Sequence, residues 1–189
     1  DVARDYMKAG LYEDALYALS FTDENSPLVS YYKAYITNDI SYIEKAEKAD
    51  MGYCFPSNVE DIAVLEFAIE NGKNAANANY YLGCRFRYDE AAGCFENCVC
   101  INPCHGRAWR NLSLYLFDKK HNGKKALYCM ENALKYRNED PRLLLEYEQL
   151  LKNTNASIEE RLAVYDKYPE LLKARDDCYL DKLTLLSQQ

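Results

Sequence analysis

Two stretches of this chain repeat the same order of residues, and this repetition limits the possible folds more than any other feature. Residues 12–15 read Tyr-Glu-Asp-Ala and residues 88–91 read Tyr-Asp-Glu-Ala, and a proline follows twelve residues after the alanine in both copies. A third copy begins at Ala126, where Asn138 takes the place of the proline. A recurring pattern of this kind indicates a repeat architecture, in which each unit packs on its neighbours.

The other half of the pattern lies between the second and third copies. Trp109, Leu112 and Leu116 follow each other at intervals of three and four residues, which places them on one stripe of a helix. Small residues at Gly83 and Ser113 occupy the same place in successive copies, and we expect them to let two helices approach closely. The repeated unit is therefore a pair of packed helices.

This alternation resembles the tetratricopeptide repeat, a helix-turn-helix unit of about 34 residues. In that family the first helix carries a large residue, then Leu, then Gly or Ala, then Tyr. The second helix carries Ala, an aromatic residue, Ala and Pro. The resemblance implies an all-α fold, an α-α superhelix in the form of a right-handed solenoid with about twelve helices.

The composition agrees with a helical chain. There are only 7 Gly and 5 Pro, whereas folds built from strands need many turn residues. The 18 Tyr far outnumber the 6 Phe and the single Trp. A tyrosine-rich interior predicts thin layers, in which the ring is buried and the hydroxyl reaches water.

Apolar periodicity and capping signals give the expected helix limits. A serine with a glutamate three residues later predicts a capping box at the start of a helix. A serine or aspartate directly before a proline also predicts a helix start. The capping boxes are expected at Ser41 with Glu44, Ser57 with Glu60 and Ser157 with Glu160, the proline starts at 26–27 and 140–141, and a stop at Gly72. The expected helices span residues 2–9, 12–21, 28–37, 41–49, 58–71, 76–86, 88–101, 105–119, 124–136, 141–153, 157–166 and 169–187, with a break in the last near Asp176.

One long interruption, at residues 50–58, separates two groups of expected helices. We expect residues 1–50 to form irregular repeat-like helices with a truncated first repeat. Residues 51–189 are expected to form the central and C-terminal repeats, continuous with the first group in one solenoid. Because the first repeat lacks most of its first helix and the first residue is Asp, we expect the chain to be cut from a longer one.

The chain from about Cys54 onward is also similar to the C-terminal helical region of large bacterial proteins whose N-terminal part is a β-rich domain of unknown function. Proteins of that group often sit near carbohydrate metabolism. The resemblance implies an alternative role, a non-catalytic accessory module that docks to its own N-terminal domain. The residues that carry it are 54–57, 78–83, 109–112, 126–127 and 175–177.

The formal charge is −7 and the isoelectric point is near 5.0, so nothing attracts the chain to nucleic acid or to anionic membranes. The sequence has no apolar run near 20 residues and no secretory signal pattern. A helical chain of 189 residues does not need disulfides, so we interpret the 8 Cys as reduced thiols and expect a cytoplasmic protein.

Cysteine and histidine gather in one segment, at Cys94, Cys98, Cys104 and His105, and thiols with an imidazole could hold a metal ion. The spacing is not that of paired zinc ligands, and cysteine as a small apolar filler explains it better. Cys104 and His105 are sequence neighbours, which rarely face each other as a catalytic pair must. With no glycine-rich phosphate loop either, we expect no enzyme activity, metal or cofactor.

The expected function is binding of a protein or peptide in the concave groove that the first helices line. Arg107, Arg110 and Arg142 are expected to converge there and could clamp an acidic peptide or a C-terminal carboxylate. The alternative is that these arginines bridge to acidic residues of neighbouring helices. The predicted groove residues are Tyr31, Tyr35, Asn77, Tyr80, Arg107, Arg110, Asn111 and Arg142, joined by Cys84, Leu114, Leu145 and Gln149.

Overall fold

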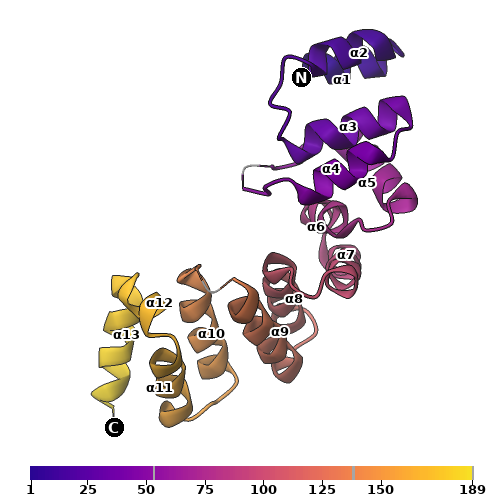
Figure 1. Cartoon of the computed structure of the whole chain (residues 1–189). Coiled ribbons are helices and arrows are strands. Elements are labelled where there is room, and N and C mark those ends of the chain that lie inside the picture. Colours follow the sequence, from indigo (N-terminus) through magenta and orange to yellow (C-terminus); the bar gives the residue numbers. More distant parts are fainter. Residues whose placement is uncertain (53, 138, 189) are drawn as a thin grey trace. The chain divides into compact units, whose positions relative to one another are not determined.

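The structure, a computed structural model, describes residues 1–52, 54–137 and 139–188. In this part of the chain it contains thirteen helices and no strand (Figure 1). The predicted role of Asn138 lies outside the described residues. The helices divide into two compact units, residues 1–102 (unit 1) and residues 103–189 (unit 2). The all-α prediction is confirmed.

Unit 1 is built from three helix pairs and one additional helix. The pairs are α1 with α2, α3 with α4, and α6 with α7, and α5 packs against both α3 and α6. The bounds are α1 (Val2–Lys8), α2 (Tyr12–Leu19), α3 (Pro27–Thr37), α4 (Ser41–Lys48), α5 (Val59–Asn71), α6 (Ala76–Arg85) and α7 (Tyr88–Ile101).

Unit 2 continues the alternation, with α8 packed on α9, α9 on α10, and α10 on α11. Trp109 of α8 donates its indole N–H to the carbonyl oxygen of Pro103 at 2.8 Å and meets Tyr128 of α9 edge to face. The last predicted helix breaks just before Asp176, as expected. The bounds are α8 (Gly106–Asp118), α9 (Gly123–Tyr136), α10 (Arg142–Asn153), α11 (Ile158–Lys167), α12 (Pro169–Lys173) and α13 (Asp176–Leu186).

The interruption at residues 50–58 does not separate compact units, because it lies inside unit 1. Cys54 and Pro56 are buried. Ile43 of α4, before the interruption, belongs to the same apolar core as Val64 of α5, after it. The division therefore falls after Asn102, where α7 ends, and not near residue 50.

Three of the predicted helix boundaries are confirmed. The Ser157 hydroxyl accepts from the Glu160 N–H at 3.2 Å, and the Glu160 carboxylate accepts from the Ser157 N–H at 2.8 Å, which completes a capping box. Ser26 precedes Pro27 at the start of α3. Gly72 ends α5.

Two predicted capping boxes are wrong. Ser41 is the first residue inside α4, and its N–H donates to the carboxylate of Asp39 at 2.9 Å. At the start of α5 the box is formed by Asn58 and Asp61, one residue later than predicted. Asp61 also accepts from the N–H of Ser57 at 2.7 Å, so this carboxylate satisfies two backbone donors at once.

Small residues bring paired helices close together, as predicted. A Cβ added to Gly83 of α6 would lie 2.7 Å from Cε1 of Phe95 on α7. The side chain of Ser113 on α8 donates to the carbonyl oxygen of Ala126 on α9 at 2.7 Å. The turn between α6 and α7 is only two residues long, yet these helices remain a packed pair.

Replacing Gly83 with alanine is therefore expected to destabilise unit 1 by about 1–3 kcal/mol, because the added methyl group overpacks the contact with Phe95. Urea denaturation followed by circular dichroism measures the change. Gly93→Ala is the matched control, since a Cβ built there on α7 meets no atom within 4 Å from the described residues beyond its chain neighbours and its own helix backbone. The control is expected to be neutral or to stabilise by about 0.5–1 kcal/mol; equal effects of the two variants would contradict the close-packing argument.

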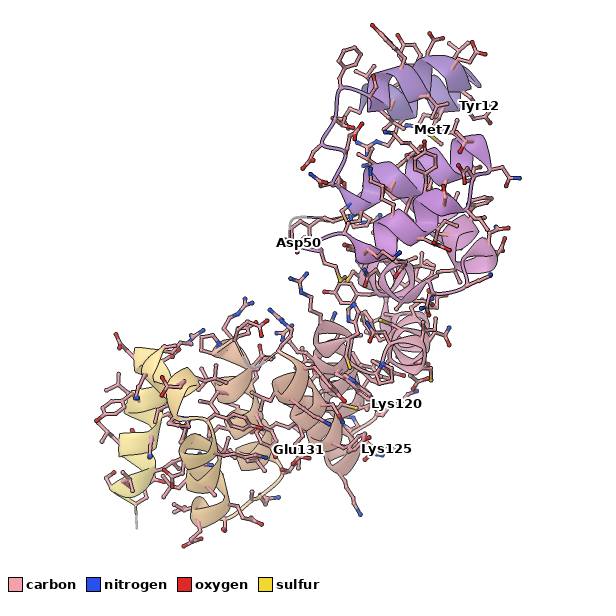
Figure 2. The ribbon with its side chains drawn as sticks, viewed as in Figure 1. Met7, Tyr12, Asp50, Lys120, Lys125 and Glu131 are labelled. Atoms are coloured by element: carbon pink, nitrogen blue, oxygen red, sulfur yellow. The ribbon has the colours of Figure 1, made fainter. Side chains whose placement is uncertain are left out.

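Four buried tyrosines link neighbouring helices, because their hydroxyls donate to carboxylates on other helices. Glu131 of α9, labelled in Figure 2, accepts from Tyr147 of α10 at 2.6 Å. Each such pair satisfies a polar group at a helix interface. The others are Tyr31 with Glu47 at 2.7 Å, Tyr32 with Asp61 at 2.6 Å and Tyr165 with Asp181 at 2.7 Å.

Among the described residues, none of the helices combines the length and the apolar character that crossing a membrane would need.

Candidate functional site

Two predicted groove residues of unit 1, Tyr31 and Asn77, meet at Glu47 of α4. Tyr31 has no exposed surface, and its hydroxyl donates to Glu47 Oε1 at 2.7 Å. The Asn77 N–H donates to Glu47 Oε2 at 2.7 Å, and its side-chain Nδ2 donates to the Glu47 backbone oxygen at 3.0 Å. Tyr31 is therefore a core residue and presents no ring to a ligand.

Glu47 was not among the predicted site residues. Its carboxylate also accepts from the N–H of Ala78 at 3.0 Å, so it caps the first turn of α6. Burial raises the pKa of this carboxyl group, against the opposing effect of the hydrogen bonds from Tyr31, Asn77 and Ala78. No sequence motif marks this residue, because its partners lie on α3 and α6 and are brought to it only by the fold.

Tyr35 and Tyr80, the other predicted groove residues of unit 1, are half-buried. The ring of Tyr35 meets that of Phe67 edge to face, with 5.6 Å between the ring centroids. The ring centroids of Tyr80 and Phe95 lie 6.0 Å apart. Tyr35 also lines a small cavity of about 150 Å³ together with Met7 and Tyr12, which are labelled in Figure 2. Both rings mainly fill space between helices.

In unit 2, Arg110 forms a two-pronged ion pair with Glu146 of α10. Its Nε and Nη2 lie 2.6 and 2.5 Å from the two carboxylate oxygens. The hydrogen bonds that Arg110 donates to Glu146 raise the pKa of Arg110. Nη1 of Arg110 reaches the side-chain oxygen of Asn111 at 3.4 Å. Arg110 therefore bridges to an acidic residue of another helix, which is the alternative stated in the sequence analysis.

Arg142 is also ion-paired within the protein. Its Nε and Nη2 each lie 3.1 Å from the carboxylate of Asp140, which Arg137 contacts at 2.8 Å as well. Burial raises the pKa of Asp140, but the hydrogen bonds from Arg142 and the charges of both arginines outweigh it, and the pKa is lowered. Arg107 lies half-buried in the first turn of α8. Two of the three predicted arginines, Arg110 and Arg142, are thus paired with carboxylates of the protein itself.

A small pocket of about 170 Å³ lies between α8 and α10, and we call its surroundings the α8/α10 face. Leu114 and Gln149, two of the predicted groove positions, line it, and so does Glu146, the partner of Arg110. The apolar wall of the pocket includes Phe117 and Met130, which were not among the predicted groove residues. The remaining lining residues are Ser113, Asp118, Leu150 and Asn153.

Three of the four candidate ligands in the cysteine segment are buried, and Cys104 is exposed. Cys94 and Cys98 are buried, and burial raises the pKa of both thiols, which disfavours the thiolate that a metal would need. His105 is buried at the start of α8, where its Nδ1 accepts from the Ala108 N–H at 3.1 Å. Burial, helped by nearby arginines, lowers its pKa to about 4. In the described part of the chain, no three His, Cys, Asp or Glu side chains are grouped as metal ligands would be.

No protein-family model matches this chain. Among solved structures it is similar to the crystal structure of MamA, with 17% identity and a TM-score of 0.53, over 92% of this chain and 96% of that one. It is similar to MamA 41-end from Desulfovibrio magneticus RS-1, with 18% identity and a TM-score of 0.52, over 93% of both chains. It is also similar to YrrB, described as a TPR protein with an unusual peptide-binding site, with 18% identity and a TM-score of 0.55, over 94% of this chain and 82% of that one. The likeness shows the fold, an α-α solenoid of the tetratricopeptide type.

Proposed function

We propose that this chain is a non-catalytic scaffold that binds a peptide or protein segment on the α8/α10 face of unit 2. One observation carries the proposal, namely that an apolar pocket opens beside guanidinium groups on the helices that the repeat pattern assigns to the groove. Aromatic and aliphatic walls next to a charged rim are typical of surfaces that anchor one side chain of a peptide.

The chemistry of the face favours a particular kind of peptide. An apolar side chain would enter the pocket between Leu114 and Phe117. Arg142 exposes 67% of its side chain, and its Nη1 makes no hydrogen bond to the described residues, so it can donate to an acidic group of the peptide. Arg110 and Glu146 neutralise each other and would set the position of the peptide without adding net charge.

The fold supports this proposal, because one of the similar solved structures is described as having a peptide-binding site. A cytoplasmic location, and the alternative role as an accessory module that docks to a β-rich domain of a larger bacterial protein, stay predictions. In the pocket lining, the hydroxyl of Ser113 donates to the carbonyl oxygen of Ala126, in keeping with a packing role for this side chain.

A random peptide library displayed on phage and selected on the whole chain tests the proposal. Selected peptides are expected to share an apolar residue next to an acidic one. Their affinity is expected to fall about tenfold or more in Leu114→Asp, which places a charge in the pocket, and about threefold to tenfold in Arg142→Ala.

Matched controls keep that result specific. Leu180→Asp makes the same change on α13, where the side chain is 62% exposed. Lys125→Ala removes a cation at the start of α9, and Figure 2 labels this residue together with Lys120. Lys125 follows the C-terminal end of α8, whereas Arg107 lies at the N-terminal end of α8. Both controls are expected to bind as the unchanged chain does. Selected peptides that bind Leu114→Asp with full affinity would rule out the α8/α10 face.

A further inference from the structure

A second pocket, of about 440 Å³, lies entirely in unit 1 and is independent of the proposed peptide site. It is enclosed by α4, by the connection from α5 to α6 and by the end of α7. Gly72 shapes it, because a Cβ there would lie 2.6 Å from the Ala68 carbonyl oxygen and 2.9 Å from Ile43. Its volume is that of a pocket that holds a side chain or a small molecule.

Asn77 gives the pocket a hydrogen-bond acceptor of fixed orientation. Asn77 lines the pocket, and only 7% of the surface of this residue is exposed. Nδ2 donates to the Glu47 backbone oxygen, which turns the side-chain oxygen the other way. That Oδ1 has no hydrogen-bond partner among the described residues. This oxygen is not among the buried polar atoms left without a partner, so it faces the open pocket, where a donor on a ligand can reach it.

Glu47 adds a negative charge to the same wall. Its Oε1 already accepts from Tyr31 and Ala78, but Oε2 accepts only from the N–H of Asn77 and retains capacity. Within the described ranges, no ion pair involves Glu47, and none involves Glu44, which also lines the pocket. A half-buried carboxylate without a cation creates a place where a cation would gain energy.

We propose that this pocket binds the arginine side chain of a partner protein. A guanidinium group is planar and carries several donors in fixed directions, so it can reach the Glu47 carboxylate and the Asn77 oxygen together. The aliphatic stem would lie against Ile43 and Ile101. Ile40 and Ile101 are 49% and 39% exposed at the pocket, and they give the rest of the partner chain apolar contact area.

Charge on and around the pocket sets how many cations it accepts. The whole chain carries a formal charge of −7, which attracts a basic partner. Lys48 and Lys73 also line the pocket, and neither forms an ion pair with the described residues. Their charges formally balance those of Glu44 and Glu47 in the lining, so the pocket has no excess negative charge to hold a cation beyond the one that Glu47 and Asn77 contact directly. The two lysines would favour an acidic residue beside the bound arginine.

Nuclear magnetic resonance titration of the whole labelled chain tests the proposal with Nα-acetyl-L-arginine methylamide as the probe. The largest shifts are expected at the Asn77 side-chain amide and at the Ile43 and Ile101 methyl groups. The citrulline analogue has the same shape without the charge and is expected to bind about tenfold more weakly or not at all. Equal binding of the two probes, or shifts located elsewhere, would overturn the proposal.

A blocking variant separates recognition from folding. Ile101→Lys places a cation at the pocket on a partly exposed residue and leaves the Glu47 hydrogen bonds intact, and it is expected to weaken arginine binding about tenfold. Leu180→Lys on α13 of unit 2 is the matched control, expected to bind within about twofold of the unchanged chain. Unaltered binding by Ile101→Lys, with its fold verified by circular dichroism, would also exclude the pocket.

A final comparison distinguishes a protein partner from a free small cation. The peptide Ala-Ala-Arg-Ala-Ala is expected to bind at least about tenfold more tightly than the single-residue probe, because the exposed isoleucines contact its flanking residues. Equal affinities would contradict the protein-partner assignment and assign the pocket to a free monocation. The Leu114→Asp variant of unit 2 is expected to leave all these affinities unchanged. The proposal for the peptide site and the proposal for this pocket can therefore be rejected independently of each other.

Discussion

Glu148→Ala is expected to destabilise unit 2 by about 3–5 kcal/mol, because it leaves the cation of Arg161 buried without its partner. Glu148 of α10 is 1% exposed, and Arg161 of α11 is 9% exposed. The two form an ion pair across the helix interface, with Arg161 Nε 2.6 Å from Glu148 Oε1. Guanidinium denaturation followed by tryptophan fluorescence measures the loss.

The double variant Glu148→Leu with Arg161→Met is the control for that result. It removes both charges and fills the same space with apolar side chains, so it is expected to recover most of the lost stability. If the double variant is as unstable as Glu148→Ala, packing and not the unpaired charge explains the effect. If Glu148→Ala alone costs less than about 1 kcal/mol, the pair behaves as an exposed one and the argument from burial is wrong.

Asp61→Ala is expected to destabilise unit 1 by about 3–5 kcal/mol, since several donors lose one shared acceptor. Asp61 is fully buried. It accepts from the Tyr32 hydroxyl at 2.6 Å and from the N–H groups of Ser57 and Asn58 at 2.7 and 2.8 Å, and Arg4 lies 3.7 Å away. Urea denaturation followed by circular dichroism measures the change, and Glu70→Ala on the exposed side of α5 is expected to change it by no more than about 0.5 kcal/mol.

The pH dependence of Asp61 gives the same prediction a second readout. Burial raises the pKa of this carboxyl group, but the hydrogen bonds from Tyr32, Asn58 and Ser57 outweigh burial, and the net pKa lies below its ordinary value of 3.8. A carboxyl group with a lowered pKa in the folded state stabilises the fold above the pKa of the unfolded state. Its contribution is lost as the pH falls below 3.8 and through the folded-state pKa. Asp61→Ala should therefore show a smaller loss of stability between pH 5 and pH 3 than the unchanged chain.

Much of the fold could be predicted from the sequence because repeated local signals define it. The alanines and prolines of the recurring unit, together with apolar periodicity, gave helices whose limits differ from the structure by only a few residues. Close packing at Gly83 could be predicted from its place in the repeat. The start of α5 could not, because Ser57 and Asn58 are both good capping residues and the choice depends on the buried position of Asp61.

The candidate sites could be predicted only in part, because they depend on distances between helices. The repeat pattern assigned Arg110 to a groove position but could not show that Glu146 of α10 lies within hydrogen-bonding distance. Tyr31 occupies a groove position in the pattern but turns into the core towards Glu47. Whether a side chain at such a position faces a ligand or a neighbouring helix is decided by an acidic residue elsewhere in the chain, and no local motif marks that residue.

The only tryptophan of the chain, Trp109, is in unit 2, beside Tyr128 of α9. Its fluorescence therefore works as a built-in optical label for one unit, whereas far-ultraviolet circular dichroism follows the helices of both. During denaturation the two signals change together if the units unfold as a single cooperative block, and they separate if each unit unfolds by itself. The position of one indole ring thus lets the unfolding of unit 2 be followed without any added dye.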